Sequence, residues 1–339
     1  MPLKFQSTGG GTVTLDVPST SSTVTLTIPA NTGNLVIADT SGNANISGNL
    51  AVTGTISTGT VAMASSFKRN RIINGNFNIW QRGTSFTSSS VNEYSADRWR
   101  TEGYSLNSVI SQQTFTVGQT AVPGYPTYYC RVTTSSAPSS FWSFTQRIEC
   151  PQNINGDGTY TLSFWAKAVS GTIAAATFTY GINAASNNSP ALTTTWQKIT
   201  VTTTLSGVSQ ASGYLTIYIV SVSSSFSSLS VDIANVQVEE GTVATPYERQ
   251  IYSDQFSQCQ RYYEKGSIKS YVGGASASGI AISSIFKVTK RSSPTMSYGT
   301  SGSRSYVPDS TEWAETESFG CIRNNANEIA ATWIASAEL

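Results

Sequence analysis

The sequence predicts an all-β protein with an N-terminal stem of β-repeats, a central antiparallel jelly-roll sandwich, and a small C-terminal β domain preceded by one short helix. Only 12% of the 339 residues are charged and 39% are hydrophobic, a balance that suits sheets joined by polar turns. Apolar and polar residues alternate with a period of two along most of the chain, and clusters of Gly, Asn and Ser separate these runs. Apolar residues recur at helical spacing at one place, after residue 250.

The N-terminal stem, residues 1–66, is built from repeats. Residues 12–18 (TVTLDVP) recur eleven residues later as residues 23–29 (TVTLTIP), and residues 46–59 place a glycine every five or six residues between isolated apolar residues. Because so few apolar side chains cannot close a core within one chain, we expect copies of the chain to cover them and the protein to be a homotrimer. The alternative for this segment is a flexible Gly/Ser/Thr linker.

The central domain, residues 67–250, begins with a tight-turn signal at residues 74–76 (NGN). Its clearest strand is residues 160–168, which places Trp165 on the polar face, opposite an apolar face formed by Tyr160, Leu162, Phe164 and Ala166. Near Asn235 the alternation slips by one residue, which indicates a β-bulge. About eight to ten strands without a helix predict a jelly-roll sandwich.

The C-terminal domain, residues 251–339, starts with the helical segment. Ser253 is the expected N-cap of this helix, and Gly266 stands where a C-terminal cap would be. Beyond it, alternation predicts the strands of a small β domain at residues 271–275, 280–290, 295–298, 304–307, 319–323 and 328–337.

Charge and composition exclude several classes of function. The formal net charge is +1 and no polybasic run occurs, so we expect neither a nucleic-acid nor a membrane partner. No segment approaches the roughly 20 apolar residues that span a bilayer, and the N-terminus lacks the apolar core of a signal peptide, so we expect assembly in a cytoplasm. The chain has no histidine, which removes His-dependent triads and His-ligated zinc. We therefore expect no enzymatic activity and no cofactor.

The four cysteines show neither CxxC pairing nor metal-ligand spacing. We expect them to be buried free thiols that pack as small hydrophobic side chains. A disulfide between Cys130 and Cys150 is the alternative.

Several motifs resemble bacteriophage and prophage tail-fibre proteins. Residues 71–83 (RIINGNFNIWQRG) with residues 94–99 (YSADRW) resemble a module common in these proteins, and residues 236–248 with residues 259–263 (CQRYY) look like the segment that follows it. The N-terminal repeats resemble the stems of phage fibres. The resemblance covers most of the chain and implies a virion component, attached to tail, baseplate or capsid proteins through residues 1–66.

The central domain is also similar to carbohydrate-binding jelly rolls. These often start with an Asn-Gly-x-Phe turn, as at residues 74–77, and carry a late Asp-x-x-x-Val strand, as at residues 232–236. Some hold a structural calcium between the first and last strands, which implies Asn78 and Asp232 as candidate ligands here. One carboxylate is a thin ligand set, because calcium takes about six to eight oxygen ligands.

Sugar recognition requires flat aromatic faces ringed by polar side chains that bond hydroxyls. Trp165 falls on the polar face of its strand beside Lys167, and Tyr218, near Tyr214, lies on the face opposite an apolar set. Trp99 stands between two arginines. Trp165, Tyr214, Tyr218 and Trp99 are therefore the candidate stacking residues. The alternative for each is packing in the core or in a trimer interface.

These observations lead to the hypothesis of a non-enzymatic phage virion protein, a short homotrimeric tail fibre or spike that contacts host-surface glycans through the avidity of three copies. One alternative is a capsid-decorating spike that stabilises the head. Another is a glycan depolymerase, which would need two carboxylates about 5–10 Å apart. The adjacent Glu239 and Glu240 point to opposite faces of a strand, and the acids of residues 309–317 fall in a polar loop.

Overall fold

The structure is a computed structural model that describes residues 3–6, 12–15, 68–88, 92–104, 106–150, 157–175, 177–183, 190–206, 213–225, 228–271, 279–300, 307–324 and 328–339. The chain divides into two compact units, Met1–Ala62 and Met63–Leu339. In the first unit, β1 (Leu3–Gln6) pairs antiparallel with β2 (Thr12–Leu15). Strand β2 confirms the start of the first predicted repeat, and the later repeats lie outside the described residues.

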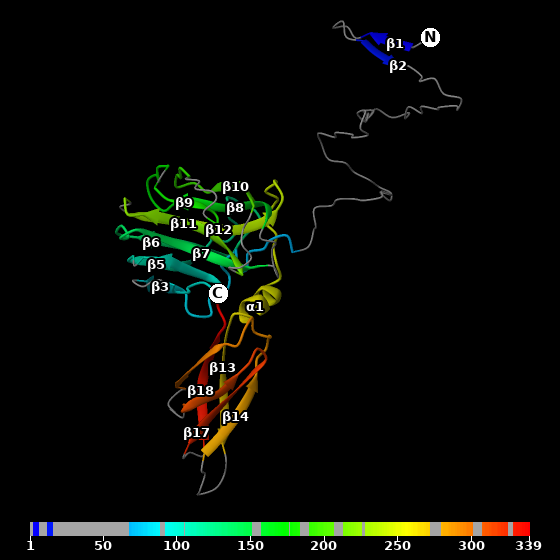
Figure 1. The fold of residues 1–339 in the computed structure, drawn as a ribbon. Coiled ribbons are helices and arrows are strands. Elements are labelled where there is room, and N and C mark those ends of the chain that lie inside the picture. Colours follow the sequence, from blue (N-terminus) through cyan, green and yellow to red (C-terminus); the bar gives the residue numbers. More distant parts are fainter. Residues whose placement is uncertain are drawn as a thin grey trace, which may run out of the picture. The chain divides into compact units, whose positions relative to one another are not determined.

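Two antiparallel sheets of the second unit form a jelly-roll-like sandwich (Figure 1). The six-stranded sheet has the order β10 (Gln197–Leu205), β8 (Gly158–Ala168), β12 (Leu229–Glu240), β6 (Tyr128–Thr134), β5 (Ser108–Thr114) and β3 (Ser85–Ser88). The four-stranded sheet has the order β4 (Trp99–Gly103), β7 (Phe141–Glu149), β11 (Tyr214–Ser223) and β9 (Thr179–Ile182). This architecture confirms the predicted all-β class.

Alternation along the strands builds the core between the two sheets. In β8 the inward set is Tyr160, Leu162, Phe164 and Ala166, and each of these side chains is buried. The outward set of the same strand includes Trp165, which stays partly exposed. The sequence pattern therefore predicted both faces of β8 correctly, because successive side chains of a strand point to opposite sides of the sheet.

The Asn-Gly turn at the start of the sandwich packs against the bulge in β12. The backbone nitrogen of Val236 donates to the carbonyl of Gly75 at 2.8 Å, and a Cβ placed on Gly75 would lie 2.1 Å from the carbonyl oxygen of Val236. Only glycine fits this contact. Pairing between β12 and β8 shifts register between Ala234 and Gln237, and Asn235 has a φ of 50°, which confirms the predicted bulge.

The C-terminal strands form two three-stranded antiparallel sheets around a second hydrophobic core (Figure 1). One sheet has the order β13 (Tyr263–Tyr271), β18 (Glu328–Ser336) and β15 (Thr295–Thr300), and the other has the order β14 (Gly279–Ile285), β17 (Ser318–Asn324) and β16 (Ser310–Ala314). Buried Phe319 and Trp333 lie at the centre of this core, with ring centroids 5.2 Å apart. The sequence predicted a small β domain in this part of the chain, and the two sheets agree with that prediction.

Helix α1 (Tyr252–Gln260) precedes these strands, as predicted, but both predicted caps are wrong. Ile251 occupies the N-cap position without a side-chain hydrogen bond, and Ser253 lies inside the helix. The helix ends at Gln260, and Gly266 lies in β13 opposite Trp333. A Cβ at Gly266 would lie 2.5 Å from Trp333 Cζ2, so this glycine makes room for an indole ring. No helix among the described residues is long and apolar enough to cross a membrane.

All four cysteines are buried and free. Burial raises the pKa of the Cys130 and Cys259 thiols well above the usual value, so these thiols stay protonated. The prediction of buried thiols is confirmed, and the Cys130–Cys150 disulfide does not form in this structure.

Charged and aromatic side chains connect the sandwich to the C-terminal strands. Glu338 pairs with Arg98, and with Arg82 at 2.8 Å. The guanidinium of Arg98 lies 3.4 Å from the ring centre of Tyr262, and that of Arg82 lies 3.6 Å from the ring centre of Tyr263. The side chains of Arg98 and Glu338 are 1% and 6% exposed. These five residues are called the join below.

Candidate functional site

The outer face of the six-stranded sheet carries the best candidate for a ligand site. Trp165 of β8 points outward, directly opposite Lys198 of β10 on one side and Ala234 of β12 on the other. Side chains opposite one another on an antiparallel pair share a face and have Cβ atoms about 5 Å apart. The register therefore places a partly exposed aromatic ring and an exposed cation side by side on the outer face of the sheet.

A cavity of about 400 Å³ lies over this face. Trp165 and Lys198 line it together with Ser163, Asn235 and Tyr247. Two segments complete the lining of the cavity: residues 123–124 from the β5–β6 connection and residues 244–247 after β12. An aromatic ring, several hydrogen-bonding side chains and a cation converge on this space, which is the composition expected of a small-molecule site.

Hydrogen bonds hold both covering segments in place. The side-chain amide of Asn235 donates to the carbonyl of Pro123 at 3.3 Å. The carboxylate of Glu239 accepts from the backbone nitrogen of Thr245 at 2.9 Å and from its hydroxyl at 2.7 Å. Lys198 Nζ donates to the carbonyls of Ala244 and Thr245 at 3.3 and 3.4 Å. The cavity is therefore preformed by contacts within the chain.

Tyr247 lines the cavity as a neutral side chain. Burial raises the pKa of Tyr247 well above its usual value, because an ionised phenolate would be poorly solvated there. The hydroxyl therefore stays protonated at any physiological pH and does not balance the charge of Lys198.

An aromatic cluster lies beside the cavity on the same face. Phe115, Tyr129 and Trp196 have ring centroids 4.7 to 5.4 Å apart, and all three side chains are partly buried. Lys167 Nζ lies 5.6 Å from the ring centre of Trp196. Trp196 stands two residues before Lys198, just ahead of β10. The period-two pattern could therefore have predicted that Trp196 and Lys198 share a face of the sheet.

Asp232, a predicted calcium ligand, lies next to this cluster and has another role. Its carboxylate is fully buried, accepts two hydrogen bonds from Arg131 at 2.7 and 3.0 Å, and pairs with Lys167 at 3.2 Å. Two cations at one carboxylate oppose the binding of a third, divalent cation. Asp232 therefore neutralises two strand cations, which disfavours the binding of calcium.

Asn78, the other predicted calcium ligand, lies partly buried in the segment after the Asn-Gly turn. Among the described residues, no group of three or more His, Cys, Asp or Glu side chains gathers in a way that could hold a metal ion. Arg131 and Lys167 engage the carboxylate of Asp232, which disfavours calcium there, and the calcium site stays a prediction.

Trp99 is a core residue, so its prediction as a stacking residue is wrong. Its side chain has 0% exposure, and its ring lies 5.2 Å from Phe77 and 5.4 Å from Phe144, centroid to centroid. The indole nitrogen donates to the carbonyl of Asn74 at 3.1 Å. Trp99 thus ties the Asn-Gly turn to the four-stranded sheet and offers no free face to a sugar.

Tyr214 and Tyr218 lie on β11 in the four-stranded sheet, so the structure does not bring them together with Trp165. The guanidinium of Arg147 lies 4.1 Å from the ring centre of Tyr214 and pairs with Glu102 at 2.7 Å. Tyr218 is 7% exposed, and burial raises its pKa. One ring is thus covered by an arginine and the other is largely buried.

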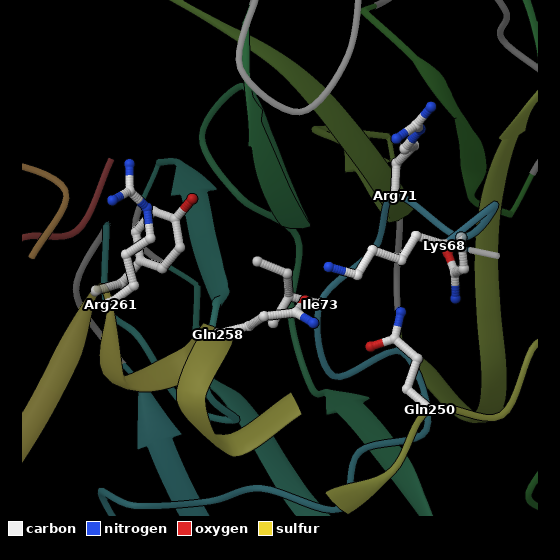
Figure 2. Close-up of a pocket in the computed structure, with 8 residues that line it drawn as sticks. Lys68, Arg71, Ile73, Gln250, Gln258 and Arg261 are labelled. Atoms are coloured by element: carbon white, nitrogen blue, oxygen red, sulfur yellow. The ribbon is translucent and has the colours of Figure 1, made fainter. Parts of the chain in front are cut away.

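A second cavity, of about 180 Å³, lies where the sandwich begins (Figure 2). Its lining includes Lys68, Arg71 and Arg261. Arg71 pairs with Glu240 at 2.9 Å and Arg261 pairs with Glu149 at 3.2 Å. Figure 2 shows the side chain of Lys68 reaching toward Ile73 while the guanidinium of Arg71 points away. This cavity is smaller than the one at Trp165, and two of its three cations have carboxylate partners.

Comparisons with known proteins give distant likenesses. No family model matches the chain, and no curated protein matches it. Among solved structures, the chain is similar to a CBM22-1 xylan-binding domain from Paenibacillus barcinonensis, at 13% identity over 47% of this chain and 94% of that one, with a TM-score of 0.30. It is similar to a family 11 carbohydrate-binding module from Clostridium thermocellum, at 12% identity over 48% of this chain and 98% of that one, with a TM-score of 0.28. It is also similar to a cyclase from Fischerella sp. TAU, at 14% identity over 51% of this chain and 97% of that one, with a TM-score of 0.34. At these scores the likenesses carry no argument about function.

Proposed function

We propose that this protein is a non-enzymatic, glycan-binding component of a phage virion, and that the Trp165 cavity is its glycan site. The observation that carries the glycan part is the position of Trp165. Its partly exposed ring lies on a sheet face, inside a cavity that Ser163 and Asn235 also line. A flat aromatic surface packs against the C–H face of a sugar ring, and the polar groups around it bond hydroxyls.

The composition of the cavity supports binding without hydrolysis. No Asp or Glu is among the described residues that line it, whereas glycoside hydrolysis canonically uses two carboxylates on either side of the scissile bond. If the site binds one sugar weakly, three copies on one fibre would raise the avidity by orders of magnitude.

The virion part of the proposal is supported by the sequence motifs. Residues 71–83 and 94–99 resemble a module of phage tail-fibre proteins, and the repeats of residues 1–66 resemble fibre stems. In this proposal residues 1–66 mediate homotrimer formation and attachment to other virion proteins, and the sandwich contacts host-surface glycan. The chain would be assembled in the host cytoplasm and carried in the virion as a short tail fibre or spike.

The test of the glycan site is binding of the full chain to immobilised host polysaccharide. Because truncation of a central tryptophan in a binding site typically costs about 2 kcal/mol or more, Trp165→Ala should weaken binding by about 30-fold. Trp313→Ala is the matched control, since Trp313 is another partly exposed tryptophan, 41% accessible, on β16 of the C-terminal strands. If Trp313→Ala lost binding and Trp165→Ala kept it, the assignment of the site would be wrong.

Two measurements test the virion assignment. The mass of the full chain in solution should be that of a trimer, and a monomer would contradict the role given to the stem. Density for the protein in virion images should lie on the tail or baseplate. Density on the capsid would instead support a decorating spike.

A further inference from the structure

We propose that the Trp165 cavity selects acidic glycans, with a sugar carboxylate paired to the ammonium of Lys198 while the sugar ring stacks on Trp165. This inference rests on the proposed glycan-binding function and adds the chemical class of the ligand. It follows from the charges that line the cavity and from the strand register that sets two side chains next to each other.

Lys198 is the one charged residue among the described residues that line the cavity. Its ammonium donates to two neutral backbone carbonyls, at 3.3 and 3.4 Å, and it forms none of the ion pairs found among the described residues. Other cations of the sandwich have carboxylate partners, for example Lys167 with Asp232 at 3.2 Å and Arg71 with Glu240 at 2.9 Å. The cavity therefore presents a positive charge that the described part of the chain does not neutralise.

The position of this charge suits an acidic sugar. Lys198 lies directly opposite Trp165 in the β10–β8 register, so the two Cβ atoms are about 5 Å apart on one face. In a uronic or sialic acid the carboxylate is attached at the edge of the sugar ring. A ring stacked on Trp165 would thus bring its carboxylate beside the ring of Trp165, where the Lys198 side chain stands.

A neutral sugar would fit the same cavity less well. A stacked ring removes water from around the ammonium, and a neutral hydroxyl would replace that water as a hydrogen-bond acceptor but would supply no counter-charge. A carboxylate supplies both a charge-assisted hydrogen bond and the missing counter-charge. Ser163 and Asn235 also line the cavity. In this proposal they bond sugar hydroxyls, Asn235 through the amide atoms that its bond to Pro123 does not use, so different groups recognise the ring and the acid.

The experiment compares each acidic glycan with a neutral counterpart of the same backbone. Titration calorimetry with the full chain would use oligogalacturonate and oligoglucuronate, each against its carboxyl-reduced form, and sialyllactose against lactose. We expect at least one acidic member to bind about fivefold to tenfold more tightly than its neutral counterpart. The preference should shrink as the salt concentration rises from about 0.05 to 0.5 M, because salt screens a partly exposed charge pair.

Variants assign the preference to Lys198. Lys198→Gln should remove the preference for the acidic form and keep residual binding of the neutral form, and Trp165→Ala should weaken binding of both. Lys269→Gln is the matched control, since Lys269 is an exposed lysine on β13, and it should leave the preference unchanged. An equal effect of Lys269→Gln and Lys198→Gln would show a general charge effect and overturn the proposal.

The outcomes separate this inference from the proposed function. Equal binding of acidic and neutral forms, with both lost in Trp165→Ala, would overturn acid selection and leave the glycan site intact. If no member of either series binds, both proposals fail together. A preference for the neutral form would also reject the role of Lys198.

Discussion

The join combines a cation, an aromatic ring and a carboxylate, whereas the described residues that line the Trp165 cavity supply a cation and an aromatic ring but no carboxylate. In the join, the guanidinium of Arg98 lies 3.4 Å from the ring centre of Tyr262 and pairs with Glu338. In the cavity, Lys198 stands opposite Trp165, and its ammonium contacts only backbone carbonyls among its described neighbours.

The two regions also differ in burial. Arg98 and Glu338 are almost fully buried, because each supplies the counter-charge that the other needs to leave water. Lys198 is exposed, and the space beside it remains a cavity. The join thus shows what the cavity would resemble with an anionic ligand bound, and the missing carboxylate is the part that a ligand would bring.

The largest expected effect is that of breaking the join. Glu338→Gln keeps the shape of the side chain but leaves buried Arg98 without its counter-charge, and removal of one member of a buried ion pair costs about 3–5 kcal/mol. Urea unfolding should show a loss of about this size. Glu312→Gln, at an exposed position of β16, should stay within about 0.5 kcal/mol of the parent protein. If Glu338→Gln unfolded with the same free energy as the parent protein, the join would add little stability.

A smaller effect concerns Tyr262 of the join at high pH. Burial raises the pKa of Tyr262 to about 12, above its unfolded value of about 10. Between pH 10 and 12 the unfolded chain loses this proton and the folded chain keeps it, so stability falls as pH rises. A two-unit shift corresponds to about 2.7 kcal/mol at most.

The variant Tyr262→Phe isolates this contribution. Whatever the offset between the two proteins at pH 8, the parent protein should lose about 2 kcal/mol more than Tyr262→Phe between pH 10 and 12. Chemical unfolding at a series of pH values measures the difference. Parallel curves for the two proteins would show that the hydroxyl of Tyr262 ionises in the folded state as readily as in the unfolded one.

The faces of individual strands could be predicted from the sequence. The period-two pattern placed Trp165 on the outer face of β8 and Tyr160 in the core, because one strand decides which side each residue takes. The bulge at Asn235 also followed from a slip in that pattern. The overall all-β class, helix α1 and the buried thiols followed from composition and spacing.

The partners of these residues could not be predicted, because they depend on contacts between distant strands. Lys198 faces Trp165 only through the β10–β8 register, and residues 244–247 cover the cavity only because Glu239 holds Thr245. The sequence suggested that Asp232 is a calcium ligand, whereas the structure places Arg131 of β6 and Lys167 of β8 beside its carboxylate. The homotrimer and the domain boundaries at residues 66 and 250 stay predictions.

The smallest expected effect is the stability change in Lys198→Gln, and it tests the comparison most directly. If Lys198 lacks a counter-charge within the chain, its replacement breaks no ion pair and alters only two long hydrogen bonds to carbonyls. The free energy of unfolding should then stay within about 0.5 kcal/mol of the parent value, while Glu338→Gln loses several times more. Urea unfolding of both variants under one set of conditions gives the contrast. A loss above about 1 kcal/mol in Lys198→Gln would show that the ammonium already has a strong partner within the chain. Lys198 would then have its counter-charge within the protein, as Arg98 has in the join.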